Sequence, residues 1–213
     1  MAPPGKVILA SGSPQRKSLL KELGVQFRAI TSEVEETSEG EPRDVVLANA
    51  LAKGRAVAAR RREGTLVIAG DTEVVVDGRV VGQPGFEGEA RWCLETLSGR
   101  THEVLGALAL IGPDRVSGEM SVRTGVESSR VTFGELAPEL IDRYLASGEW
   151  KGRAGGYAVQ GLGSALIDGI DGDVSNVIGL PVRLLLRLAP ELGPPARRNR
   201  AQGQSEKPRT LGI

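Results

Sequence analysis

The sequence has little of several residue types on which whole classes of site depend. Its single cysteine, Cys93, excludes a disulfide within the chain. With only one histidine, His102, a metal cage built from thiolates or imidazoles is also out of reach. A metal here would therefore be a hard cation bound by oxygen atoms. A lone histidine at the start of a predicted strand is more often structural than catalytic.

Aromatic residues and net charge are equally scarce. Aromatics make up 3% of the chain, so no platform for stacking bases is visible. Lysine plus arginine and aspartate plus glutamate number 27 each, so no overall field favours a nucleic acid or a membrane. No run of 18 apolar residues occurs, and the N-terminal apolar run is too short for a signal peptide. We expect a cytoplasmic protein that binds neither a nucleic acid nor a membrane.

The 213 residues and 40% hydrophobic content are sufficient for a real core. Residues 1–193 carry the apolar pattern, and they could form one domain or two small lobes. Residues 194–213 contain almost no apolar side chains and several arginines. That composition cannot offset the entropy of ordering, so it predicts a disordered basic tail.

The segment around Asp71 is the best defined candidate site. An apolar run, Leu66–Ala69, predicts a buried strand that ends at Gly70. A carboxylate directly after a central strand faces the crevice where open α/β sheets bind ligands, so Asp71 is placed to hold a metal or take a proton from water. Capping a turn is the alternative role. Asp77-Gly78 then predicts a tight hairpin, which would put Asp71 at a strand-to-hairpin corner.

The first helix offers a candidate phosphate site at its entrance. A strand over Lys6–Ala10 leads into a helix with Ser13 as N-cap and Pro14 as its first residue. Free backbone N–H groups and the helix dipole attract phosphate there, and Ser11 and Arg16 flank the entrance. Many α/β proteins have the same strand-loop-helix connection without any ligand, so the helix entrance alone does not establish phosphate binding.

A second helix places a lysine among apolar residues. The acidic loop Ser32–Glu41 reads as a solvated surface segment, within which Glu35 and Glu36 could reach a cation. The helix predicted over Pro42–Arg62 carries Lys53 on its apolar stripe. An inward lysine favours a phosphate or carboxylate partner, because burial of an unpaired charge is costly. Snorkelling to the surface is the alternative.

The remaining chain continues the α/β pattern and contains a glycine-rich stretch. Its glycines would let a backbone approach a flat ligand, and Gln160 carries the donor and the acceptor needed to read a base edge. Turning corners is the other use of such glycines. The predicted elements are helices over Glu87–Leu97, Pro138–Leu145 and Leu180–Leu192, an antiparallel strand pair over Thr101–Ile111 and Glu119–Phe133, and short strands over Tyr157–Gln160 and Ala165–Ile170.

Seven blocks then occur in the order found in the Maf family of nucleoside triphosphate pyrophosphatases: LASGSPQRKSLLKELGV, VEE, ALAKGRA, GDT, LSGRTHEV, GGYAVQGLG and NVIGLP. The chain resembles this family from Val7 to Leu192. The resemblance implies an α/β fold, a mixed β-sheet with flanking helices and two lobes around a central cleft, similar to inosine triphosphate pyrophosphatase. It also implies a homodimer that hydrolyses a nucleoside triphosphate to the monophosphate and pyrophosphate with a divalent cation, Mg²⁺ or Mn²⁺.

The resemblance assigns roles to individual residues. Asp71 matches the proton acceptor, and other polar positions of the family's cleft are matched by Ser11, Arg16, Glu36 and Lys53. In the mechanism that we expect, the cation is bound by Asp71 and Glu36 together with triphosphate oxygens. Lys53 would contact the departing pyrophosphate with Arg16 and the helix entrance at Ser13. The expected catalytic residues are Asp71, Glu36 and Lys53, and the expected substrate-binding residues are Ser11, Ser13, Gln15, Arg16, Thr72, Gln83 and Gln160.

Two positions depart from the family pattern. Gln15 and Gln83 stand where the family usually has arginine and lysine, so the site has lost two positive charges and implies a slower enzyme or a shifted substrate. Thr72 and Gln160 resemble the branch that acts on dTTP and UTP. The alternative is a nucleotide-binding regulator of septum formation with little catalysis.

Overall fold

The computed structural model describes residues 6–61, 64–114 and 118–193, and the predicted tail over 194–213 lies outside these ranges. Within them, no helix is long and apolar enough to cross a bilayer. The elements are β1 (Val7–Leu9), α1 (Pro14–Glu22), β2 (Phe27–Ala29), α2 (Pro42–Ala58), β3 (Leu66–Val76), β4 (Arg79–Val80), α3 (Glu87–Leu97), β5 (Thr101–Pro113), β6 (Met120–Phe133), α4 (Pro138–Ser147), the 3₁₀ turns η1 (Ala154–Gly156) and η2 (Gly161–Leu166), β7 (Ile167–Asp171), α5 (Val174–Ile178), α6 (Val182–Leu188) and η3 (Pro190–Leu192).

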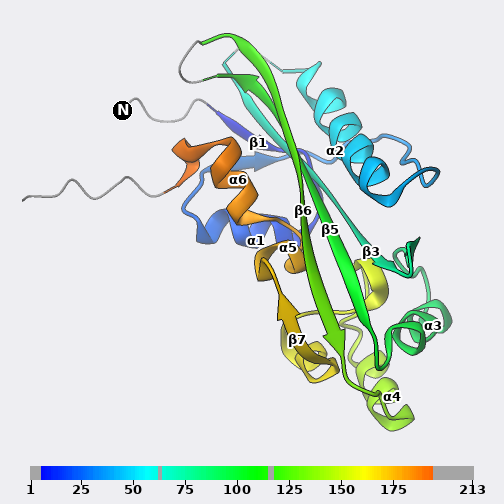
Figure 1. Ribbon diagram of the computed structural model, residues 1–213. Helices are drawn as coiled ribbons and strands as arrows, with labels where there is room; N and C mark the ends of the chain where they lie inside the picture. Colours follow the sequence, from blue (N-terminus) through cyan, green and yellow to red (C-terminus); the bar gives the residue numbers. More distant parts are fainter. Residues whose placement is uncertain (1–5, 62–63, 115–117, 194–213) are drawn as a thin grey trace, which may run out of the picture.

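One mixed sheet organises the chain. Its strand order is β2-β1-β3-β5-β6-β7, and β4 pairs with β3 off this path. β1 is parallel to β2 and β3, whereas β3, β5, β6 and β7 are antiparallel in succession. The long strands β5 and β6 run through the length of the molecule in Figure 1. The predicted α/β class with a mixed, helix-flanked sheet is confirmed.

Alternation along β3 sends successive side chains to opposite layers of helices. Leu66 and Ile68 pack with α1 and α6, and Val67 and Ala69 pack with α2 on the other face. Gly54 allows α2 to approach closely, because a Cβ there would lie 3.0 Å from a methyl carbon of Ile111. This close approach brings the neighbouring residue of α2, Lys53, against β3.

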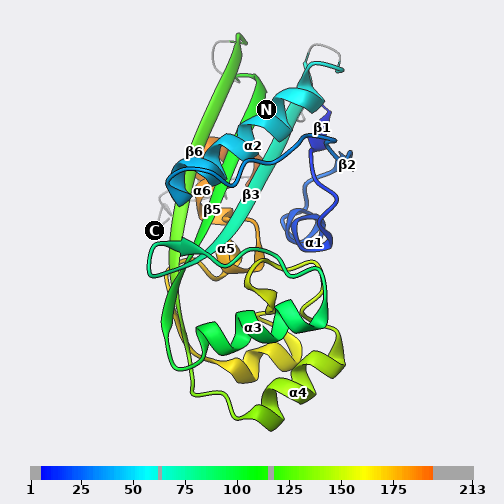
Figure 2. The same cartoon turned by 90° about the vertical axis from the view of Figure 1, so that its right-hand side faces the viewer.

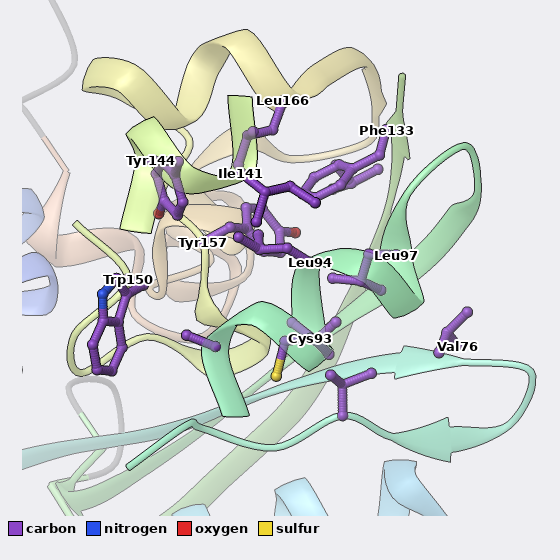
Figure 3. Close-up of a cluster of buried hydrophobic side chains, with 14 of the residues drawn as sticks. Val76, Cys93, Leu94, Leu97, Phe133, Ile141, Tyr144, Trp150, Tyr157 and Leu166 are labelled. Atoms are coloured by element: carbon purple, nitrogen blue, oxygen red, sulfur yellow. The ribbon is translucent and has the colours of Figure 1, made fainter. Parts of the chain in front are cut away.

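The other end of the sheet has its own apolar cluster, covered by α3 and α4 (Figures 2 and 3). Phe133 from β6, Leu94 from α3 and Tyr144 from α4 are almost completely buried there. Tyr157, from the segment after η1, joins them. Burial of one such large side chain stabilises the fold by about 1.5–3 kcal/mol. This cluster therefore anchors the segment after η1, which contributes Tyr157 to it.

The predicted hairpin is confirmed. Val75 pairs with Val80 and Val76 with Arg79. The two residues between them, Asp77 and Gly78, have φ angles of 48° and 74°. Positive φ at both central positions is what a type I′ turn requires, and Asp-Gly is among the few sequences that adopt it readily.

The prediction that the strand ends at Gly70 is wrong, because β3 continues through Asp71 to Val76. Its parallel neighbour β1 does stop, at Leu9 opposite Ile68. On the other side, β5 keeps pairing, with Asp71 opposite Ala107. Asp71 therefore lies inside a strand, just beyond the point where β1 ends, rather than at a corner.

Two predicted helices were too long. α2 ends at Ala58 rather than Arg62, because the following arginines offer no apolar face to pack on the sheet. The helix predicted over Leu180–Leu192 divides into α6 and η3. Pro190 disfavours a helical conformation at the residue before it, and Ala189 has φ −142° and ψ 73°.

The predicted strand over Tyr157–Gln160 is wrong, and the next strand begins at Ile167 rather than Ala165. Gly155, Gly156 and Gly161 flank the first segment with positive φ angles that turn the chain into 3₁₀ structure. The glycines thus turn corners here, and they do so at the edge of the cavity described next.

Candidate active site

A cavity of about 720 Å³ lies between the two ends of the sheet. Its walls come from the entrance of α1, the acidic loop, α2 and β3 on one side, and from the segments around Gln83, Arg153 and Gln160 on the other. The structure brings together at this cavity every residue expected for the site: Ser11, Ser13, Gln15, Arg16, Glu36, Lys53, Asp71, Thr72, Gln83 and Gln160.

Lys53 lies at the centre of the acidic part of the cavity. Its Nζ donates to Asp71 Oδ1 at 2.7 Å and lies 2.7 Å from Glu36 Oε2. Lys53 and Asp71 are both buried, whereas the Glu36 side chain is 51% exposed. The inward lysine therefore meets carboxylates, as predicted, and the snorkelling alternative is wrong.

Asp71 has one satisfied and one unsatisfied oxygen. Oδ1 accepts from Lys53, while Oδ2 is buried and has no hydrogen-bond partner among the described residues. A buried acceptor without a partner costs about 1–3 kcal/mol, so such an atom favours a ligand that supplies a proton or a positive charge. This arrangement does not fit the turn-cap role, since Asp71 sits within a strand and its acceptor bond comes from a lysine.

A third carboxyl group, that of Glu73, lines the same cavity. Burial raises its pKa to about 7, with a further contribution from the negative charges of Asp71 and Glu36 and partial opposition from Lys53. Glu73 was not among the residues expected for the site. Its spacing could have found it, because residues two apart on one strand face the same side.

Arg16 connects three segments of the cavity wall. Its Nε donates to Gly179 O at 2.9 Å, Nη1 to Ser11 Oγ at 3.2 Å and Nη2 to Thr72 Oγ1 at 2.9 Å. Burial lowers its pKa, and nearby carboxylates partly oppose that shift. An arginine remains charged in proteins, so Arg16 supplies a fixed positive charge at the entrance of α1.

The entrance of α1 has the predicted cap. Ser13 precedes Pro14, its Oγ accepts from Arg16 N at 3.4 Å, and its hydroxyl donates to Gln15 Oε1 at 2.8 Å. The backbone N–H of Ser13 donates to Ser11 Oγ at 3.1 Å. The first turn contains no acidic residue, so nothing in it opposes an anion at the positive end of the helix dipole.

Two neutral amides occupy the far wall. Gln83 lies in the loop after β4, and Gln160 immediately precedes η2. Both are exposed at the cavity. An amide offers both a donor and an acceptor, so these two side chains suit an uncharged ligand group, whereas Arg153 on the same side carries a positive charge.

The carboxylates alone do not form a complete metal centre. Among the described residues, no group of three or more His, Cys, Asp or Glu side chains is arranged to hold a metal ion. Mg²⁺ characteristically uses one or two carboxylates and completes its shell with water and substrate phosphates. The free oxygen of Asp71 beside the exposed Glu36 fits that mode of binding.

Comparisons with known proteins cover most of the chain. The family model described as Maf-like protein matches residues 6–192, which include every residue that lines the cavity. The chain is 45% identical over 184 residues to the dTTP/UTP pyrophosphatase of Bacillus cereus (strain ZK / E33L), covering 85% of this chain and 93% of the relative. It is 44% identical over 184 residues to the dTTP/UTP pyrophosphatase of Bacillus anthracis, with the same coverage. The Staphylococcus aureus Ham1 protein is a more distant structural neighbour, with a TM-score of 0.40 and 21% identity over 60% of this chain and 72% of that chain.

Proposed function

The chain belongs to the Maf family, and we propose from this premise that it hydrolyses dTTP and UTP to the nucleoside monophosphate and pyrophosphate. The observation that carries the proposal is the buried Asp71, with Oδ1 bound to Lys53 and Oδ2 free, in a cavity that also contains a capped helix entrance. The names of the Bacillus relatives support the choice of nucleotides.

Asp71 acts in this proposal as the proton acceptor for the attacking water. Lys53 binds one carboxylate oxygen and thereby fixes the rotation of the side chain, while the second oxygen is available to the water. A positioned acid or base contributes a factor of about 10²–10⁴ to the rate.

A divalent cation, Mg²⁺ or Mn²⁺, would be held by Asp71 and Glu36 together with substrate oxygens. The unpartnered Oδ2 of Asp71 supports this mode of binding, because a carboxylate oxygen has lone pairs for both a cation and a water molecule. When bound, the cation neutralises triphosphate charge and polarises a phosphoryl oxygen.

The departing pyrophosphate would contact Arg16 and the entrance of α1. A guanidinium has five N–H donors, and Arg16 uses three of them within the protein, which leaves two for the ligand. Because its three protein bonds hold the group in place, little entropy is lost when phosphate binds. The hydroxyls of Ser11 and Ser13 line the same end of the cavity.

Base recognition would fall to Gln160, with Thr72 nearer the phosphates. The Gln160 amide can donate to O4 and accept from N3–H of thymine or uracil. Gln15 and Gln83 place neutral amides at two positions where the family usually has cations, so we expect weaker attraction for the triphosphate than a fully basic site would give.

A panel of nucleoside triphosphates, with pyrophosphate and phosphate release measured separately, tests the proposal. We expect pyrophosphate as the product and the highest kcat/KM for dTTP and UTP. Release of orthophosphate, or preference for a purine nucleotide, would contradict it. Tight binding without turnover would instead favour the second candidate, a nucleotide-binding regulator of septum formation, for which Gln15 and Gln83 are the specific evidence.

The assembly and location of the enzyme also belong to the proposal. The family resemblance supports a homodimer, and a nucleotide substrate together with a single, buried cysteine supports the cytoplasm. Sedimentation of the full chain at micromolar concentration tests the dimer, since a monomer at that concentration would exclude it.

A further inference from the structure

Glu149, just beyond α4, binds the backbone of the segment that carries Gln160. Its Oε1 accepts from Leu162 N and its Oε2 from Gly163 N, each at 3.0 Å. These two N–H groups lie in the first turn of η2, the 3₁₀ turn that begins one residue after Gln160. Both backbone bonds lower the pKa of the Glu149 carboxyl, so it stays ionised and holds both donors at neutral pH.

Tyr144, within α4, binds the other end of the same segment. Its hydroxyl oxygen accepts from Ala158 N at 2.9 Å, and the residue is completely buried. The two ends also touch each other, because a Cβ on Gly163 would lie 2.2 Å from Ala158 O. Residues 158–163 therefore form a closed loop that carries Gln160. Tyr144 of α4 binds one end of this loop, and Glu149, just beyond α4, binds the other.

Glu149 is itself firmly held. It lies between Gly148, which ends α4 with φ 71°, and Trp150, which is buried and donates from Nε1 to Leu145 O at 3.2 Å (Figure 3). Arg153 Nε donates to Glu149 O at 2.7 Å. The carboxylate reaches the loop only because position 161 is glycine, where a Cβ would lie 2.5 Å from Glu149 Oε1.

We propose that Glu149 and Tyr144 are positioning residues that fix Gln160 for recognition of the base. Neither residue needs to touch the nucleotide. Glu149 and Tyr144 hold the backbone on both sides of Gln160 in one conformation before the nucleotide binds. A preorganised side chain loses less conformational entropy when its ligand binds. This inference rests on the proposed function, since it assumes that Gln160 reads a pyrimidine.

The test compares kcat/KM for dTTP and dCTP, which differ at the edge that Gln160 would read. In Glu149→Ala and Tyr144→Phe we expect the dTTP to dCTP ratio to fall at least about fivefold, mainly through KM for dTTP. Glu149→Gln keeps one of the two acceptors and should give an intermediate ratio. Glu139→Ala removes an exposed carboxylate from α4, the helix that carries Tyr144, and should leave the ratio unchanged.

A Gln160→Ala background separates positioning from general stability. If Glu149 acts through Gln160, adding Glu149→Ala to that background leaves the ratio where Gln160→Ala alone puts it. A further fall of the ratio in the double variant would overturn the inference. So would an unchanged ratio in both Glu149→Ala and Tyr144→Phe. Amide exchange at Leu162 and Gly163 provides a second measurement on Glu149→Gln: faster exchange confined to these residues supports the inference, and unchanged exchange contradicts it.

Failure of the proposed function would look different. In that case the wild-type protein would release no pyrophosphate from any nucleotide. The ratio of dTTP to dCTP affinity, measured by calorimetry on the same variants, then takes the place of the kinetic ratio. An unchanged affinity ratio in Glu149→Ala would overturn the positioning role independently of catalysis.

Discussion

Lys53 Nζ lies 2.7 Å from Asp71 Oδ1, and both residues are buried in the wall of the cavity. Loss of one partner from a buried ion pair leaves an uncompensated charge and typically costs about 3–5 kcal/mol. The same ammonium group also lies 2.7 Å from Glu36 Oε2. One lysine thus lies between two carboxylates and offsets part of their mutual repulsion.

Lys53→Met should therefore weaken both stability and catalysis. We expect the free energy of unfolding to fall by roughly 3 kcal/mol without added metal, and turnover of dTTP to fall with it. Mg²⁺ or Mn²⁺ should restore part of the lost stability, because a cation between Asp71 and Glu36 replaces the missing positive charge. Thermal unfolding with and without the cation measures this. Lys21→Met, an exposed position on α1, is the matched control. A folded Lys53→Met protein with normal stability and turnover would refute both roles.

His102 should make stability depend on pH. It is buried, its Nε2 lies 2.8 Å from Tyr157 Oη, and burial lowers its pKa to about 4. The unfolded chain has the ordinary pKa of about 6.5, so between these values the unfolded state binds more protons. Stability is fully present above pH 6.5 and is lost as the pH falls toward 4, by up to about 3 kcal/mol.

His102→Gln keeps a polar partner for Tyr157 and removes the titration. Denaturant unfolding at pH 7.5 and pH 5 should show a loss of about 2 kcal/mol in the wild type from this group, and that part of the loss should be absent in the variant. The difference between the two proteins is the informative quantity, since other groups titrate in both. Equal losses in the two would show that His102 titrates normally in the folded state.

Gln160→Glu should change which base is preferred. A carboxylate cannot donate to O4 of thymine or uracil, but it can accept from the donor-rich edge of guanine. We expect kcat/KM for dTTP and UTP to fall more than kcat/KM for GTP. Gln26→Glu adds the same charge at an exposed position outside the cavity lining and should leave the preference unchanged. An identical effect on all nucleotides would mean that Gln160 does not contact the base.

Local signals were enough to predict much of the fold. The Ser13-Pro14 cap, the Asp77-Gly78 turn and the helix over Glu87–Leu97 each depend on neighbouring residues alone, and all three are confirmed. The inward direction of the Lys53 side chain was also favoured by the sequence, because the apolar stripe of α2 continues on both sides of this residue. These features could be predicted because the residues that cause them are close together in the sequence.

The missed features depend on distant partners. β3 continues past Gly70 because β5 pairs with it, and β5 lies more than 30 residues away in the chain. α5 is only five residues long and is held by Asn176, whose side chain donates to Val104 O across the sheet. β2 was missed for a related reason, since Phe27–Ala29 is a three-residue edge strand defined by its pairing with β1.

The candidate site was predicted in composition but not in geometry. The ten residues expected from the family pattern do line one cavity. The residue pattern alone could not show that Lys53 pairs with both Asp71 and Glu36, or that burial would raise the pKa of Glu73 to about 7. Both properties arise from the packing of α2 on β3.

Hydrolysis of dTTP in H₂¹⁸O by the wild-type protein and by Asp71→Asn tests the central claim most directly. We predict one ¹⁸O atom in each dTMP and none in pyrophosphate, because water attacks the α-phosphorus. Asp71→Asn should bind dTTP and remain folded, with turnover lowered by a factor of at least about 10² because the proton acceptor is gone. Label in pyrophosphate, or near-normal turnover in a folded Asp71→Asn protein, would contradict the account.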